Sequence, residues 1–206
     1  MLPGLPEALA SHHLFVSGAL HEGPQTILLL SPDEPGFWAH VTAQPEFDDG
    51  APDPLDRWST RVITALATQF DAQPRFPFTG PPWHPFVTWA IASGQSFDSP
   101  IHLMVHTRMG LWASVRGALI VPDHLPLPTP APNPCIGCPA PCLTACPVAA
   151  LGANGYDVPA CHAHLDAPDG EACRNSGCLA RRACPAGESY GRLAKQSAWH
   201  MRQFHP

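Results

Sequence analysis

Eight cysteines are the residues of this chain whose type and spacing could do chemistry, and all of them lie between positions 135 and 184. The first run has the pattern Cys-x2-Cys-x3-Cys-x3-Cys-Pro and ends at Cys146-Pro147, and the last cysteine again precedes a proline, at Cys184-Pro185. A cysteine run that closes on Cys-Pro is typical of bacterial-type iron–sulfur ligation, in which the closing cysteine binds the cluster of the other run. Eight thiolates are also the number that two [4Fe–4S] clusters require.

This crossing predicts which cysteines bind each cluster. A cubane needs four thiolates near the corners of a tetrahedron, so three ligands come from one segment and the fourth comes from a distant one. Cluster I is predicted to be bound by Cys135, Cys138, Cys142 and Cys184. Cluster II is predicted to be bound by Cys161, Cys173, Cys178 and Cys146. The spacing is longer than in the common C-x2-C-x2-C-x3-C-P run, and the second set is the looser of the two.

Other uses of the eight thiols remain open at this point. Structural zinc sites also use four cysteines, commonly as paired C-x2-C knuckles, and only Cys135 and Cys138 form such a pair. His162 and His164 lie beside Cys161 and could replace thiolates in a zinc site. One cluster with spare thiols is a further alternative. Disulfides are another, although a reducing compartment favours metal ligation.

Composition and charge limit the compartment and the partners. The N-terminus lacks the basic region of a secretory signal, and no apolar run approaches the 18 residues of a membrane span. We therefore expect a cytoplasmic protein without a membrane partner. Residues 173–206 carry six basic side chains and one acidic one. A basic tail can indicate nucleic acid, but anionic clusters would account for these charges, so nucleic acid is not an expected partner.

A proline-rich segment divides the chain. Six of the thirteen residues in 122–134 are proline, which predicts an extended, semi-rigid linker. We therefore predict a domain at 1–121, a linker at 122–134 and a cysteine-bearing domain at 135–206.

Apolar patterns predict an α+β or α/β fold in which helices cover a sheet. Short apolar runs predict strands at 26–30, 101–105 and 114–121. Helical spacing, proline and capping residues predict helices at 53–70, with Asp53 as N-cap, and from residue 85. In the second half we expect helices at 148–151 and 188–204.

The cysteine-bearing half resembles a ferredoxin-type domain with two [4Fe–4S] clusters. The sequence Cys-Pro-Val-Ala-Ala-Leu, followed by Val-Pro-Ala-Cys161-His-Ala-His-Leu, looks most like the C-terminal part of epoxyqueuosine reductase. In that family an isolated cysteine precedes the last three, and Cys161 fits this place. The substrate-binding helical repeats of those reductases are absent from this sequence, so transfer-RNA modification is not expected.

The first half resembles cobalamin-processing (CblC-type) proteins. Residues 106–117, His-Thr-Arg-Met-Gly-Leu-Trp-Ala-Ser-Val-Arg-Gly, are similar to the family segment H-P-x-x-G-x-W-x-x-x-R-G, with Thr107 in place of proline. The resemblance implies a nitroreductase-like fold that holds cobalamin or a flavin. The residues that it marks for cofactor binding are His106, Gly110, Trp112 and Arg116. The same residues are also compatible with a hairpin that has a packed Trp and a surface Arg.

These patterns lead to one functional expectation and two alternatives. We expect an iron–sulfur, ferredoxin-like electron-transfer protein that delivers electrons to a corrinoid or flavin in the first half. If it is an enzyme, it would be an oxidoreductase, a corrinoid-linked reductase, and its partner would be a redox protein or a small-molecule electron acceptor. The alternatives are a zinc-stabilised binding module and a cobalamin-processing chaperone without redox clusters.

Overall fold

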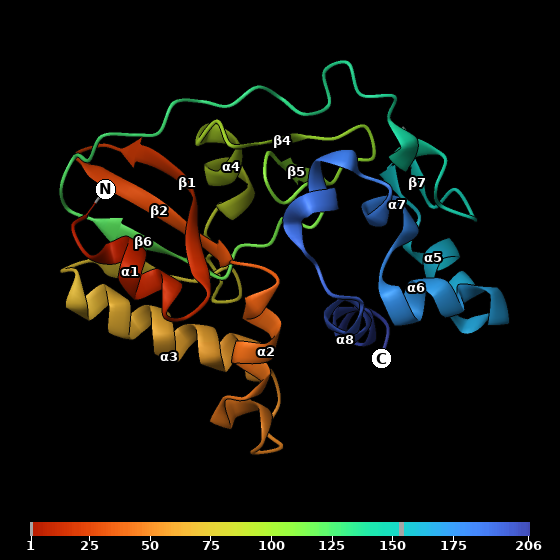
Figure 1. Cartoon of the computed structure of the whole chain (residues 1–206), viewed down its shortest axis with the longest axis horizontal. Helices are drawn as coiled ribbons and strands as arrows, with labels where there is room; N and C mark the ends of the chain where they lie inside the picture. Colours follow the sequence, from red (N-terminus) through yellow and green to blue (C-terminus); the bar gives the residue numbers. More distant parts are fainter. Residues whose placement is uncertain (1, 153–154) are drawn as a thin grey trace. The chain divides into compact units, whose positions relative to one another are not determined.

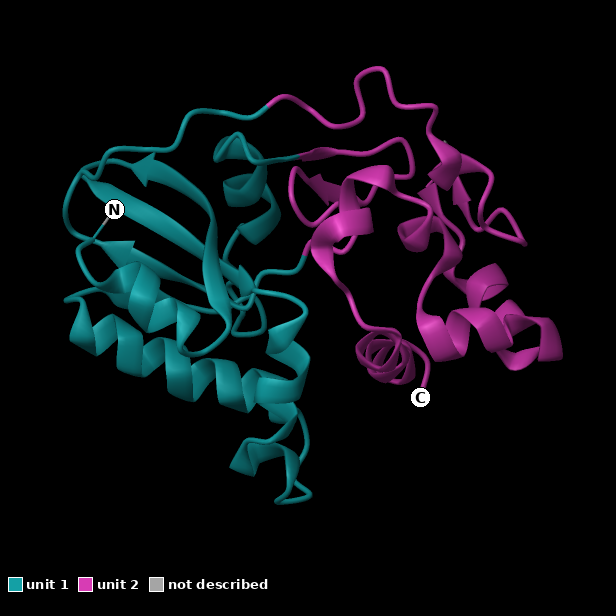
Figure 2. Cartoon of the chain, viewed as in Figure 1, with its two compact units in different colours: residues 1–96, 114–131 teal, residues 97–113, 132–206 magenta. Residues whose placement is uncertain are grey.

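The computed structural model describes residues 2–152 and 155–206 and has an α+β fold (Figure 1). The chain forms two compact units, coloured in Figure 2. Unit 1 contains residues 1–96 and 114–131, and unit 2 contains residues 97–113 and 132–206. The domain boundaries that the sequence predicts, at residues 121 and 135, remain predictions. In the structure the chain enters unit 2 first at residue 97, returns to unit 1 at 114, and leaves it again after 131.

Unit 1 is built on a four-stranded sheet with the order β1-β2-β6-β3, in which all neighbours are antiparallel. Its strands are β1 (Leu14–Glu22), β2 (Gln25–Pro32), β3 (Gln73–Arg75) and β6 (Gly117–Val121). The central strands β2 and β6 are almost wholly buried. A continuous apolar run is typical of a strand that is covered on both faces, and the strand predicted at 26–30 is confirmed as part of β2.

Helix α3 (Pro54–Gln69) packs against β3 and β6 and supplies much of the core of unit 1. It buries the apolar face expected from its sequence, including Trp58, Val62 and Leu66. Asp53 stands at the N-cap position, but its backbone is left-handed and its side chain makes no capping hydrogen bond. Proline at the first turn, rather than a capping carboxylate, therefore favours the start of this helix.

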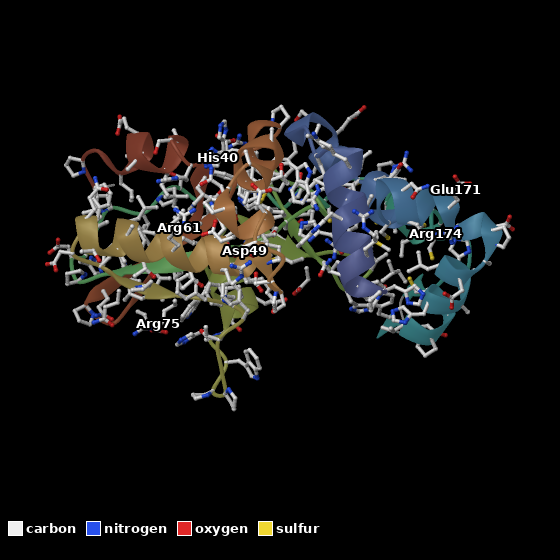
Figure 3. All side chains as sticks on the ribbon, turned by 90° about the horizontal axis from the view of Figure 1, so that it is seen from below. His40, Asp49, Arg61, Arg75, Glu171 and Arg174 are labelled. Carbon is white, nitrogen blue, oxygen red and sulfur yellow. The ribbon has the colours of Figure 1, made fainter. Side chains whose placement is uncertain are left out.

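Shorter helices complete unit 1. They are α1 (Leu5–Ala10), α2 (Gly36–Thr42), the 3-10 turn η1 (Pro45–Phe47) and α4 (Phe86–Ala92). Helix α4 begins after Pro85 and buries Phe86, Trp89 and Ala90, as predicted. Arg61 of α3, labelled in Figure 3, forms an ion pair with the buried Glu46 of η1 at 2.5 Å.

The proline-rich segment has no helix or strand between residues 124 and 133. Its first part is held on unit 1 by the Thr26 hydroxyl, which donates to the Asp123 carbonyl and accepts from the Leu125 N–H. Further along, the Gln95 side chain donates to the Thr129 carbonyl. The segment is therefore irregular, and hydrogen bonds attach it to the unit that precedes it.

Unit 2 consists of short elements around the cysteines. Two small hairpins pair β4 (Ser96–Asp98) with β5 (Met104–His106) and β7 (Leu151–Gly152) with β8 (Gly155–Tyr156). The helices are α5 (Val158–Asp166), α6 (Glu171–Ser176), α7 (Leu179–Arg182) and α8 (Ala194–Phe204), and the 3-10 turns are η2 (Pro141–Leu143), η3 (Pro168–Gly170) and η4 (Pro185–Tyr190). Helices α6 and α8 pack against each other.

Three predicted elements that fall in unit 2 need correction. Residues 148–151 are not a helix, because Ala149 has a left-handed backbone and Leu151 begins β7. The helix predicted at 188–204 is divided, because Gly191 takes a φ of 80° between η4 and α8. The strand predicted at 101–105 forms only from Met104, as β5.

No helix in the described part of the chain has the length and apolar character needed to cross a membrane.

Candidate metal centre

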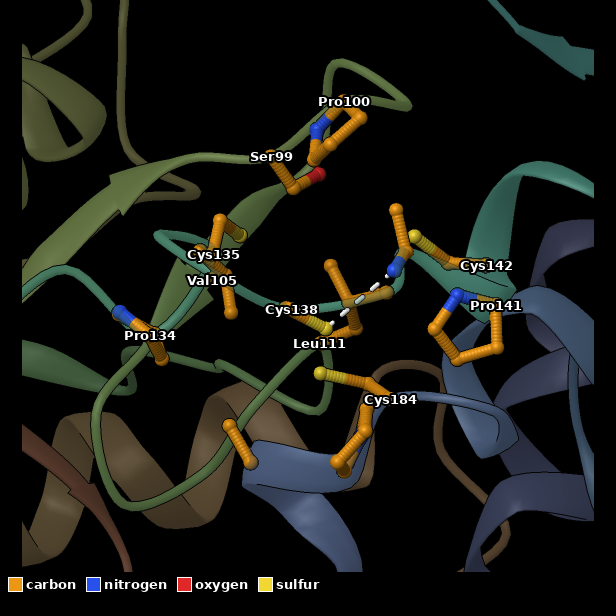
Figure 4. Close-up of a pocket in the computed structure, with 13 residues that line it drawn as sticks. Ser99, Pro100, Val105, Leu111, Pro134, Cys135, Cys138, Pro141, Cys142 and Cys184 are labelled. Carbon is orange, nitrogen blue, oxygen red and sulfur yellow. Dashed lines mark hydrogen bonds between the residues drawn. The ribbon is translucent and has the colours of Figure 1, made fainter.

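Four cysteines of unit 2 line one pocket (Figure 4). We call them the first thiol group, and its members are Cys135, Cys138, Cys142 and Cys184. Three come from the turn at 135–142, in which Cys142 lies in η2, and the fourth is the N-cap residue of η4. The remaining lining is apolar apart from Ser99. The structure thus gathers into one pocket the four cysteines that the sequence assigns to cluster I.

The other four cysteines lie near one another, because the Cys161 and Cys173 thiols both interact electrostatically with Cys178 and Cys146. We call them the second thiol group, and its members are Cys146, Cys161, Cys173 and Cys178. Cys161 lies in α5, Cys173 lies in α6, and Cys178 is the N-cap residue of α7. Cys146 comes from the first run, so each group contains one closing Cys-Pro cysteine from the opposite run.

The electrostatic environment disfavours thiolates in the absence of a cation. Burial raises the pKa of Cys135 and Cys142, and the other thiols of the first group raise it further. Burial likewise raises the pKa of Cys161 and Cys173, with additional contributions from their own group. Four mutually repelling thiolates need a cationic centre to be stable, and a bound metal supplies that charge. None of the eight cysteines is in a disulfide.

Hydrogen-bond donors are directed at several of the sulfur atoms. The Ala140 N–H donates to Cys138 Sγ at 3.4 Å, and the Ala150 N–H donates to Cys146 Sγ at 3.3 Å. The Tyr156 hydroxyl donates to Cys161 Sγ at 3.3 Å. Such donors favour the thiolate form and, in iron–sulfur proteins, contribute to the reduction potential.

Both thiol groups adjoin one hydrophobic core. Ile101, Val105 and Leu111 form this core together with Cys142 of the first group, and Cys178 of the second group packs against it. Much of the apolar contribution comes from residues 97–113, which precede Cys135 by 22 to 38 positions in the sequence. One packed interior therefore contacts cysteines of both groups.

A half-buried cation accompanies the second thiol group. Burial lowers the pKa of Arg181, while the Cys178 thiol and the Tyr156 hydroxyl act in the opposite direction. Its guanidinium donates to the Leu111 carbonyl at 3.1 Å. Among the described residues no carboxylate forms an ion pair with it. An arginine keeps its charge in proteins, so this positive charge is placed beside sulfur rather than beside a carboxylate.

The thiols are not arranged as a site for a single metal ion. Over residues 2–152 and 155–206, no three His, Cys, Asp or Glu side chains are close enough together to hold one.

The four residues marked by the resemblance for cofactor binding fall in different units. His106, Gly110 and Trp112 belong to unit 2, whereas Arg116 belongs to unit 1. His106 is buried, and its Nδ1 accepts the N–H groups of Arg108 and Met109 at 3.0 and 3.2 Å. A neutral imidazole that accepts at Nδ1 carries its proton on Nε2, which leaves no lone pair for cobalt.

The other three residues also have structural contacts. Gly110 has a φ of 55° and lies against the backbone of Gly187. The Trp112 ring lies under the guanidinium of Arg192 at 5.4 Å. Arg116 is buried in unit 1, where it forms an ion pair with Asp56 and donates to the Ser59 hydroxyl at 3.0 Å. The predicted cofactor site at these residues therefore depends on the resemblance alone.

Sequence reasoning did not identify Ser99, Tyr156 and Arg181 as residues of the centre. Tyr156 precedes Cys161 by five positions, and Arg181 follows Cys178 by three, so proximity to a cysteine was an available signal. Ser99 lies 36 positions before Cys135, and nothing in the local sequence indicates that it lines the pocket.

Comparison with protein-family models, with curated proteins and with solved structures found no match to this chain. The resemblances to epoxyqueuosine reductase and to cobalamin-processing proteins thus remain predictions from short motifs.

Proposed function

We propose that this chain is an iron–sulfur electron-transfer protein whose unit 2 binds two [4Fe–4S] clusters. The observation that carries the proposal is the division of eight cysteines into two sets of four, each with one closing Cys-Pro cysteine from the opposite run. Zinc or disulfide chemistry does not require this exchange, whereas bacterial-type two-cluster domains use it.

The residues around the sulfurs fit such clusters. The first group would hold one cluster and the second group the other, and the clusters would supply reversible one-electron chemistry. The chain itself provides the thiolates, the N–H and O–H donors to sulfur, and the shared apolar core. The Arg181 guanidinium offsets part of the negative charge of a four-thiolate cluster.

An exposed uncharged surface lies on the segment that carries the first run. Residues 124–156 contain no Asp, Glu, Lys or Arg. Within them Ile136, between the first two cysteines, is 82% exposed, and Leu143 and Val148 are also exposed. Apolar side chains beside a cluster form a dry contact for a partner. We assign this surface to the exchange of electrons with a redox protein or a small-molecule acceptor.

A corrinoid or flavin in the first half of the chain remains the acceptor predicted from the resemblance. Arg116 is the residue whose substitution would test such binding, because the anionic groups of these cofactors would have to compete with Asp56 for its guanidinium. Titration of the purified protein with a corrinoid and with a flavin, followed by absorbance, tests this part separately from the clusters.

Reversible reduction tests the proposed function. The protein purified without oxygen should bleach in the visible range on addition of dithionite, accept about two electrons per chain for two clusters, and regain its colour on mild oxidation. A colourless protein that contains zinc and accepts no electrons would replace this proposal by a structural metal module.

A further inference from the structure

The Ser99 side chain is a polar group in an otherwise apolar and sulfur-lined pocket (Figure 4). Its residue is 7% exposed, and its Oγ is buried. Among the described residues, this oxygen makes no hydrogen bond. Most buried hydroxyls have a partner, because an unsatisfied one loses its hydrogen bonds to water without replacement. An unpartnered hydroxyl that lines a pocket thus indicates a partner that occupies the pocket.

The backbone holds Ser99 in a fixed place. Its N–H donates to the Leu103 carbonyl at 3.1 Å, and its carbonyl accepts the His102 N–H at 3.0 Å. Pro100 follows it and also lines the pocket. This closed turn fixes the position from which the hydroxyl projects.

We infer that the Ser99 hydroxyl donates a hydrogen bond to a sulfur atom of the cluster held by the first thiol group and raises its reduction potential. The inference rests on the proposed function. Sulfur is the acceptor that the side chains of the pocket offer, since its other lining side chains are apolar. Reduction adds negative charge to the cluster, so a donor to sulfur stabilises the reduced form more than the oxidised form.

The second thiol group provides the matched comparison. There the Tyr156 hydroxyl donates to Cys161 Sγ. Each group therefore has one hydroxyl beside it from a residue outside the cysteine motif. Ser99→Ala should lower the potential of one cluster, and Tyr156→Phe should lower that of the other, because each change removes an O–H and keeps most of the side-chain shape.

The test is a spectroscopic redox titration of the intact, iron-loaded protein and its variants. We expect Ser99→Ala to lower the reduced-to-oxidised ratio of one cluster about tenfold at a fixed potential, which is 59 mV for a one-electron couple. The other cluster should be unchanged. Ser99→Thr, which keeps the hydroxyl, should behave like the parent, and Ser99→Val, which has the shape of Thr, should behave like Ser99→Ala.

The outcomes separate the inference from the proposed function. Full iron loading with unchanged potentials in the Ala variant would overturn the inference and leave the proposed function standing. Absence of iron and sulfide from the parent protein would overturn both. If the Ala variant does not assemble, the Thr and Val pair decides: equal potentials in these two variants would refute the role of the hydroxyl.

Discussion

Gly110→Ala is expected to destabilise unit 2 by displacing the segment that follows Cys184. A Cβ atom at position 110 would lie 2.3 Å from the Gly187 backbone nitrogen and 2.5 Å from its Cα. Ordinary contacts begin near 3.4 Å, so one backbone must move by roughly 1 Å, and overpacking of this kind costs about 1–3 kcal/mol. The φ of 55° adds about 1–2 kcal/mol for any residue with a Cβ.

Gly137→Ala is the matched control. Gly137 has a φ of 76°, but no atom lies within 4 Å of the Cβ that the substitution adds. The control therefore carries only the backbone cost of about 1–2 kcal/mol. Urea denaturation of the metal-free chain and its two variants measures the difference. Equal destabilisation by the two substitutions would refute the close approach of residues 110 and 187.

Because the Gly187 N–H donates to the Cys184 carbonyl, Gly110→Ala should also reduce iron loading at the first thiol group.

Three further predictions concern other parts of the chain. Cys146→Ser should remove about four of eight iron atoms, because it interrupts only the second thiol group; unchanged iron per chain would contradict this. The Arg61 side chain lowers the pKa of Glu46, so their ion pair stabilises the fold fully above the ordinary carboxyl pKa, and this stabilisation is lost as the pH falls through the lowered pKa. Glu46→Gln should cost about 1 kcal/mol near pH 7 in urea denaturation, and the cost should decrease as the pH is lowered; a cost that does not change with pH would argue against the ion pair. Asp56→Ala should destabilise unit 1 by about 3 kcal/mol or more and exceed Arg116→Met, because it leaves a buried cation unpaired; the reverse order in the same assay would be inconsistent with the burial of Arg116.

The elements that the sequence predicted well are those with a local cause. Helix α3 follows from proline at its first turn and from apolar residues at helical spacing, and β2 follows from a continuous apolar run between prolines. The Cys-Pro pattern also agrees with the pocket that Cys135, Cys138, Cys142 and Cys184 line together. The proline positions and the apolar spacing can be read within a few residues, and the Cys-Pro pattern is a recognisable motif.

The elements that the sequence did not predict depend on contacts between distant segments. Residues 148–151 include good helix formers, but Ala149 adopts a φ of 49° and the Ala150 N–H donates a hydrogen bond to Cys146 Sγ. Residues 97–113 belong to unit 2 because Ile101 and Leu111 pack beneath the cysteines. The place of Ser99 in the pocket follows from this packing, and no periodicity or motif encodes it.

Iron, acid-labile sulfide and zinc per chain, measured on protein purified without oxygen, test the central claim most directly. Two [4Fe–4S] clusters predict about eight iron and eight sulfide, with little zinc. Zinc without iron and sulfide would contradict the electron-transfer account.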